Sequence, residues 1–136
     1  MSEREKSRAT EMAVITEAKD LCAYVMKITQ KSPKQFRFTF VSRMQNLALN
    51  VIENIYRANE VFILSINMKE RLDKRLGFQH SALTELKLLA YFASVSVENN
   101  CILLKHFEQI SKRTTKCQRL LGAWINSDRK RFDQSS

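Results

Sequence analysis

Apolar residues recur at alternating spacings of three and four along most of this chain, and this pattern restricts it to packed helices. The clearest stretch lies within residues 32–59 and just beyond, where the apolar seam comprises Val41, Met44, Ala48, Val51, Ile55, Ala58 and Phe62. This spacing keeps one stripe of a helix against near-parallel partners. A second apolar edge widens the stripe: Phe40, Leu47 and Ile52. Because only Arg43 and Glu53 are charged between Phe38 and Tyr56, we expect neighbours on more than one face, including another copy of the chain.

Three further stretches carry the same alternation and predict helices over about residues 10–31, 67–99 and 103–128. Their seams are Val14, Ala18, Leu21, Val25 and Ile28; then Leu72, Leu76, Gln79, Leu83, Leu86, Ala90, Ala93 and Val97; then Leu103, Phe107, Ile110, Thr114, Cys117, Leu121 and Trp124. Gln79 is the one polar residue on the second of these seams; we interpret it as a hydrated position at the bundle edge, with a specificity-determining or binding group as the alternative. Residues 88–97 carry no charge, which indicates burial on most sides.

The residues between these stretches are typical of helix ends. Ser32 with Pro33 and Gln35, and Asn67 with Glu70, resemble capping boxes that begin helices. Asn99-Asn100 is suited to the left-handed conformation that ends one. Residues 60–67 fit either a helix extension or a loop. The sequence therefore predicts an all-α, up-down-up-down four-helix bundle over residues 10–128. We expect a flexible N-terminus at 1–9 and a basic, polar tail at 129–136.

Composition agrees with one folded helical domain. The 136 residues are 44% apolar and 27% charged, with only two Gly and one Pro to make turns. No apolar run reaches the roughly 20 residues that a membrane span needs, and the charged N-terminus is not a secretory signal. The three widely spaced cysteines, Cys22, Cys101 and Cys117, are expected to be reduced thiols of a cytoplasmic protein.

Residues suited to catalysis or to cofactor binding do not form a recognisable pattern. Gly77 and Gly122 are isolated, so no glycine-rich phosphate loop is expected. His80 and His106 fall on different predicted helices, and no Glu-x-x-His pair of the di-iron bundle type occurs. The sequence therefore predicts a protein that is not an enzyme and that holds neither a cofactor nor a metal.

Positive charge is concentrated in the last helix. The chain has 23 Lys and Arg against 14 Asp and Glu, for a net charge of +9. Between Leu103 and Arg131, eight basic residues face only Glu108 and Asp128. Three of these bases, Lys105, Lys112 and Arg119, recur every seven residues on the side away from the predicted core. Arg113 and Lys116 flank that line. The other three lie in the tail: Arg129, Lys130 and Arg131.

Such a line predicts an anion-binding surface, because soluble helices usually interleave acids with bases. The expected contacts are to phosphates and carry little sequence information. Smaller basic clusters open the second and third helices: Lys31, Lys34 and Arg37; Lys69, Arg71, Lys74 and Arg75. An aromatic surface for stacking on single strands is not expected, since Phe107 and Trp124 are assigned to the core.

Three segments are similar to a known family: KSPKQFRFTFVSRMQNLALNVIENIYRANE, LTELKLLAYFA and HFEQISKRTTKCQRLLGAWI. Over about residues 13–131 the chain resembles the accessory variability determinants of diversity-generating retroelements. It also resembles the wider set of small four-helix-bundle proteins that includes those encoded in ribosomal RNA intervening sequences.

The resemblance implies a barrel-like homopentamer without catalytic activity. Such a protein binds nucleic acid and the element's reverse transcriptase, and helps it to copy a template RNA into mutagenised cDNA. The positions that match the family's basic surface are Lys87, Lys112, Lys116 and Arg119. Tyr91 departs from the pattern, since it stands where a second base is expected. Two alternatives remain open at this point: an intervening-sequence-type protein, and an adaptor bundle whose basic face docks an acidic protein.

Overall fold

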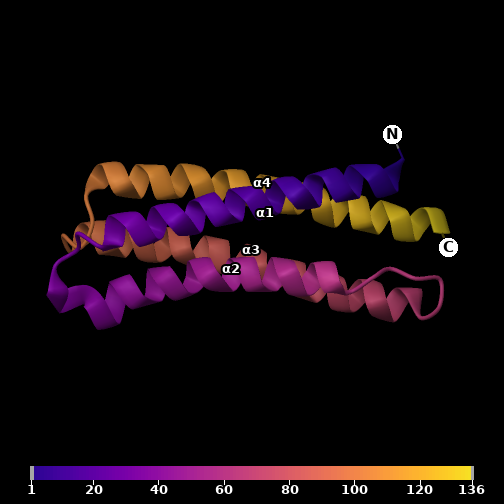
Figure 1. The fold of residues 1–136 in the computed structure, drawn as a ribbon, viewed down its shortest axis with the longest axis horizontal. Helices are drawn as coiled ribbons and strands as arrows, with labels where there is room; N and C mark the ends of the chain where they lie inside the picture. The colour runs from indigo at the N-terminus through magenta and orange to yellow at the C-terminus, as the bar shows by residue number, and fades with distance from the viewer. Residues whose placement is uncertain (1, 136) are drawn as a thin grey trace.

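The chain folds into a bundle of four long helices. The computed structural model describes residues 2–135, and within that range it contains no strand. Its elements are α1 (Glu3–Thr29), a 3₁₀ turn η1 (Lys34–Phe36), a π-helical turn η2 (Arg37–Val41), α2 (Ser42–Glu60), α3 (Met68–Glu98) and α4 (Leu104–Ser135). Figure 1 shows an elongated molecule with both chain ends and the α2–α3 connection at one end, and the other two connections at the opposite end. The predicted all-α class and four-helix bundle are confirmed.

The core is built from the predicted seams of α1, α2 and α4. All five seam residues of α1 are buried, and on α2 the burial extends from Val41 to Ala58. Trp124 of α4 is the largest fully buried side chain of the described residues. Two predicted seam residues, Phe62 and Leu103, are not buried: their side chains are 62% and 58% exposed. Both residues lie in connections rather than in helices, so the helical spacing no longer determines which way they point.

The buried face of α3 differs from the predicted one. The residues buried there are Leu72, Arg75, Gln79, Ala82, Leu86, Leu89, Ala93 and Ser96. Residues 72, 79, 86 and 93 are therefore buried as predicted. The buried residues between and after them are 75, 82, 89 and 96, each one position before the predicted residues 76, 83, 90 and 97. Leu76 and Leu83 are only half-buried. The spacing could not separate these two faces, since apolar residues occupy both and Arg75 was counted as a surface residue.

The helix starts were predicted less well than the helices. Ser32 does not cap α2: neither η1 nor α2 has a side-chain cap, and η1 and η2 precede the regular helix. Asn67 does precede α3, but it has a left-handed φ of 56° and makes no side-chain cap. Its carbonyl instead accepts a hydrogen bond from the Arg71 N–H at 2.9 Å. At the other end of α3 the prediction is confirmed, since Asn100 has a φ of 61°.

Both ends of the chain are more regular than predicted. The first helix begins at Glu3 rather than near Thr10, and the Ser2 hydroxyl caps it by accepting from the Glu5 N–H at 3.1 Å. The last helix continues through the predicted tail to Ser135. Met1, from the predicted flexible N-terminus, and Ser136, from the predicted basic, polar tail, lie outside the described residues.

Residues 61–67 form a connection and not a helix. The chain becomes extended at Val61, where φ is −91° and ψ is 102°. Phe62, Leu64 and Ile66 are exposed there, whereas Val61 and Ile63 are half-buried. Among the described residues, none of the helices combines the length and the apolar character that crossing a membrane would require.

Candidate nucleic-acid interface

The outer side of α4 carries the predicted line of basic residues. Ile110, Thr114 and Cys117 face the core and are at most 1% exposed. Because the line lies on the opposite side of the helix, its three members are exposed: Lys105, Lys112 and Arg119. Within residues 2–135, none of these three forms an ion pair. Their charges are therefore available to an anionic partner.

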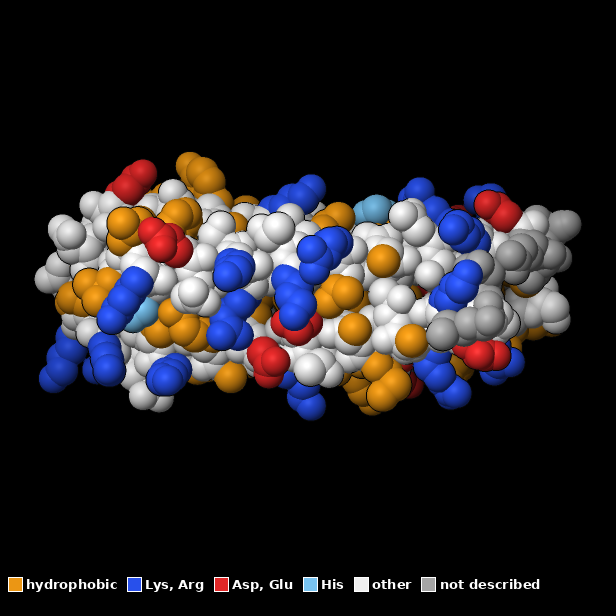
Figure 2. Space-filling model, turned by 90° about the horizontal axis from the view of Figure 1, so that it is seen from above, with side chains coloured by type: hydrophobic (Ala, Val, Ile, Leu, Met, Phe, Trp, Pro, Cys, Tyr) orange, Lys and Arg blue, Asp and Glu red, His pale blue; other side chains and the backbone are white. Residues whose placement is uncertain are grey.

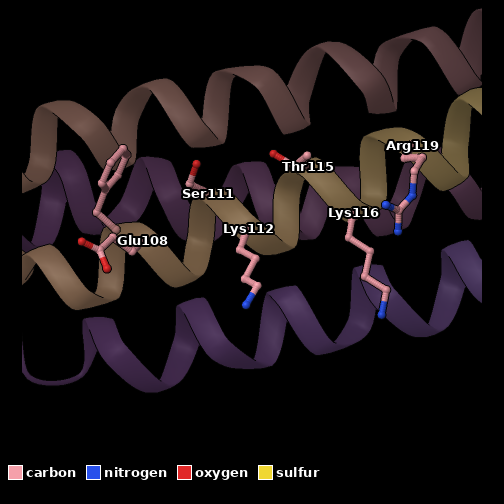
Figure 3. A pocket seen from close by; sticks show the side chains of 7 residues that line it. Glu108, Ser111, Lys112, Thr115, Lys116 and Arg119 are labelled. Carbon is pink, nitrogen blue, oxygen red and sulfur yellow. The ribbon is translucent and has the colours of Figure 1, made fainter.

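A shallow, open depression of about 510 Å³ follows this side of α4. Its lining residues are Phe107, Glu108, Ser111, Lys112, Thr115, Lys116 and Arg119. Figure 3 shows that Lys112 and Lys116 extend to the same side of α4, while Ser111 and Thr115 point to the other. Hydroxyls of this kind can donate hydrogen bonds to phosphate oxygens, but Glu108 places one negative charge in the same depression.

The two bases that flank the line have partners in α1. The Lys116 Nζ lies 2.8 Å from Glu17 Oε1, although the Lys116 side chain is still 51% exposed. The Arg113 guanidinium stacks over the Tyr24 ring at 4.8 Å from its centroid. Both contacts join α4 to α1. We therefore expect these two residues to contribute less to binding than Lys105, Lys112 and Arg119.

The remaining predicted residues lie in two other places. Arg129 and Lys130 are exposed on the C-terminal part of α4. Arg131 is half-buried and turns toward the bundle, with its Nη1 at 3.6 Å from Asp128 Oδ1. Lys87 is exposed on α3, one turn before Tyr91, which is 65% exposed. The structure thus gathers Lys112, Lys116 and Arg119 in one depression and leaves Lys87 on a different helix.

The face formed by α4 and α1 has mixed charge. Figure 2 shows many Lys and Arg side chains along it, with acidic groups near the middle of the rod and toward both of its ends, and apolar side chains between them. Basic residues also gather at the end that carries the α1–α2 connection. The positive charge is therefore not confined to α4: the segment between α1 and α2 carries the smaller predicted cluster Lys31, Lys34 and Arg37.

The structure also contains a buried ionic cluster that the sequence analysis missed. At its centre is Asp128, whose side chain is fully buried. The Arg75 Nε and the Gln79 Nε2 each donate a hydrogen bond to Asp128 Oδ2 at 2.7 Å. The Ser7 Oγ donates to Asp128 Oδ1 at 2.8 Å. Two predictions are therefore wrong: Arg75 does not belong to a surface cluster, and Gln79 is not a hydrated edge residue.

This cluster connects all four helices. Arg75 Nη1 donates to the carbonyl of Val61, which follows α2, at 3.1 Å, and its guanidinium lies 5.1 Å from the Trp124 ring centroid. Glu11 of α1 approaches Arg75 Nη2 to 3.7 Å. Burial raises the pKa of Glu11, and the charge of Arg75 opposes that rise. Because Arg75, Gln79 and Asp128 are at most 4% exposed, we assign the cluster to holding the bundle together rather than to binding.

The other chemically active side chains are dispersed. No group of three or more His, Cys, Asp or Glu within the described residues is arranged to hold a metal ion. The three cysteines are free and buried, and burial raises the pKa of Cys117 to about 12. Burial lowers the pKa of His106, and the neighbouring charges of Lys105 and Lys31 lower it further.

The fold and this surface together define a class, a four-helix bundle with an exposed line of bases on its last helix. Comparison with protein-family models, with curated proteins and with solved structures gave no match.

Proposed function

We propose that this chain is a non-catalytic accessory protein that binds nucleic acid through the basic side of α4. In this proposal it acts in the cytoplasm with the reverse transcriptase of a diversity-generating retroelement during mutagenic copying. The chain alternates in direction as an up-down-up-down bundle, and five copies assemble into a ring. The segments quoted above, which resemble the accessory variability determinants, support the connection to the retroelement and the subunit number.

The single observation that carries nucleic-acid binding is the free line on α4. Lys105, Lys112 and Arg119 are exposed, follow one side of a helix, and have no ion-pair partner within residues 2–135. The phosphates of a nucleic-acid backbone present charges at regular short intervals, so such a line can neutralise several at once. Backbone contacts of this kind give affinity without strong sequence preference.

Assembly is supported by the outer surfaces of α2 and α3. Leu49 and Tyr56 on α2, and Leu88 and Tyr91 on α3, are 41–65% exposed. Between Met44 and Ile52 the helix α2 carries no charged residue, so a second copy can cover this part of it at little electrostatic cost. Light scattering at several concentrations tests this part of the proposal. A mass equal to that of one 15.9 kDa chain throughout would contradict it.

The binding experiment reverses the charges of the three unpaired bases of the α4 line and leaves Arg113 and Lys116, which have partners in α1, unchanged. We expect the triple variant Lys105→Glu, Lys112→Glu, Arg119→Glu to bind an oligonucleotide roughly 100-fold more weakly at low salt, because three phosphate contacts are lost. A control variant, Arg57→Glu, Lys69→Glu and Lys74→Glu, changes the net charge equally but lies near the α2–α3 connection, where Arg57 and Lys69 form exposed ion pairs with Glu53 and Asp73. Filter binding measures both. Equal affinities for the two variants would show that the α4 line is not the site.

The same titration separates this proposal from the adaptor hypothesis. An adaptor that docks an acidic protein predicts no measurable affinity of the wild type for RNA or DNA. The genomic neighbourhood tests the retroelement itself: we expect a reverse transcriptase gene next to a pair of near-identical repeats. Neighbours typical of a ribosomal RNA intervening sequence would instead favour that second family.

A further inference from the structure

Phe38 is the most exposed large apolar side chain among the described residues, at 86%. It lies in the π-helical turn η2, between two phenylalanines that pack partly against the core. The rings of Phe36 and Phe40 contact each other at 5.6 Å between centroids, and Val41 is buried. The turn is thus anchored on both sides of Phe38, while that ring has no partner within the described residues. Such π turns occur frequently at functional sites.

The surroundings of Phe38 are strongly basic. Between Asp20 and Glu53 the chain has no carboxylate side chain, and it has five bases: Lys27, Lys31, Lys34, Arg37 and Arg43. Lys34 and Arg37 are exposed and lie within four residues of Phe38. No acidic residue on η1, η2 or the start of α2 offsets their charge.

A second element adds to this positive end. Lys105, from the start of α4, lines a depression together with Lys27 and Lys31 of the α1 end. His106 lines the same depression; burial lowers its pKa, and the charges of Lys105 and Lys31 lower it further. Glu108 is the one acidic residue that lines it. Figure 2 shows the Lys and Arg side chains gathered at this end of the rod.

We propose that this end of the bundle binds single-stranded nucleic acid, with Phe38 stacking on an unpaired base and Lys34 and Arg37 contacting the flanking phosphates. A cationic surface with a projecting aromatic ring is the combination that single-strand binding uses. A duplex cannot offer the same contact, because its base faces are already stacked on each other. The expectation from sequence that no aromatic residue is available for stacking is therefore replaced by this assignment. It rests on the proposed function for the class of ligand, but the contacts are assigned to Phe38, Lys34 and Arg37, and only Lys105 is common to the two surfaces.

The test uses Phe38→Ala and Phe38→Trp in the full chain, with oligo(dT), oligo(U) and a hairpin duplex as probes. Loss of one stacked base predicts about 5- to 150-fold weaker single-strand binding for Phe38→Ala, with duplex binding unchanged. Phe38→Trp keeps the affinity, and its emission is quenched by single strands and not by the duplex. The native Trp124 is fully buried, so it does not report on this surface. Phe62→Ala, a 62% exposed phenylalanine in the α2–α3 connection, is the matched control and leaves binding unchanged.

The outcomes separate this inference from the proposed function. Wild-type protein that binds neither single strands nor duplex contradicts both. Wild-type binding that Phe38→Ala leaves intact, or weakens equally for single strands and duplex, overturns the stacking role and leaves the α4 surface standing. An unquenched Phe38→Trp signal with bound oligo(dT) also overturns it. A lower mass of Phe38→Ala by light scattering, without loss of single-strand affinity, would assign the ring to an interface between copies instead.

Discussion

Replacing Asp128 by Ala removes the acceptor at the centre of the buried cluster, and we expect a loss of about 3–5 kcal/mol in the free energy of unfolding. The carboxylate accepts three side-chain hydrogen bonds at 2.7–2.8 Å, from Ser7, Arg75 and Gln79. Hydrogen bonds to a charged group contribute about 1.5–3 kcal/mol each, but they are not additive within one network. Arg75 would remain 4% exposed with only Glu11, at 3.7 Å, as an ionic partner. That uncompensated charge is the larger part of the expected loss.

Urea unfolding followed by the helical circular dichroism signal measures this loss, and the melting temperature should fall by roughly 10–20 °C for a chain of this size. Asp73→Ala is the matched control, because the Asp73 side chain is 62% exposed in its pair with Lys69. We expect that control to change stability by less than about 1 kcal/mol. Adding Arg75→Met to Asp128→Ala should recover about 2 kcal/mol or more, since the unpaired guanidinium is then gone.

The result that would refute this reasoning is specific. A loss below about 1 kcal/mol for Asp128→Ala would mean that Arg75 regains water or another partner without cost. Failure of Arg75→Met to recover any stability would mean that the loss comes from the cavity left by the aspartate and not from the stranded charge. In either case the cluster would not hold the four helices in the way described here.

Three further predictions concern stability and reactivity. Gly77→Ala should raise the free energy of unfolding in urea by about 0.5–1 kcal/mol, because Gly77 lies inside α3 and a Cβ there would meet nothing within 4 Å. A lower free energy of unfolding would contradict this and would indicate a close neighbour at that position. The raised pKa of Glu11 means that the folded state favours its protonated form. The contribution of Glu11 to the free energy of unfolding is therefore fully present below the ordinary pKa of 4.5, and it is lost as the pH rises through the pKa of Glu11 in the folded state. Glu11→Gln should therefore be more stable than the wild type at pH 7, with a difference that shrinks toward pH 4 in unfolding curves; a constant difference would contradict this sign. The thiols of Cys22, Cys101 and Cys117 are buried, and burial raises their pKa values. A thiol reagent at pH 8 should therefore label them no faster than the protein unfolds. Rapid labelling of the native state would contradict their burial.

The fold was predictable from the sequence because the apolar residues that form its core recur at helical spacing. The alternation of three and four on α1, α2 and α4 matches the buried residues closely, since the most regularly spaced apolar residues of each of those helices face the core. The third helix has apolar residues on two adjacent faces, so its spacing allowed two registers. What selects between them is the pairing of Arg75 with Asp128, 53 residues apart, and no local pattern reveals such a contact.

The surface was predictable in part. The exposure of Lys105, Lys112 and Arg119 follows directly from the helical phase of α4. The partners of Lys116 and Arg113 depend on how α1 lies against α4, which spacing within one helix does not specify. Phe38 was missed for a different reason. A continuous helix from Ser32 was expected, whereas the 3₁₀ and π turns there change which residues of the segment face outward.

The salt dependence of RNA binding tests most directly whether the α4 line contacts phosphates. For the wild type, the logarithm of the binding constant should fall linearly with the logarithm of the salt concentration. The Lys105→Glu, Lys112→Glu, Arg119→Glu variant should show a slope smaller in magnitude by about 2, since each single-strand phosphate contact contributes about 0.7. Parallel lines for the two proteins would contradict the proposed interface, whatever the difference in their affinities.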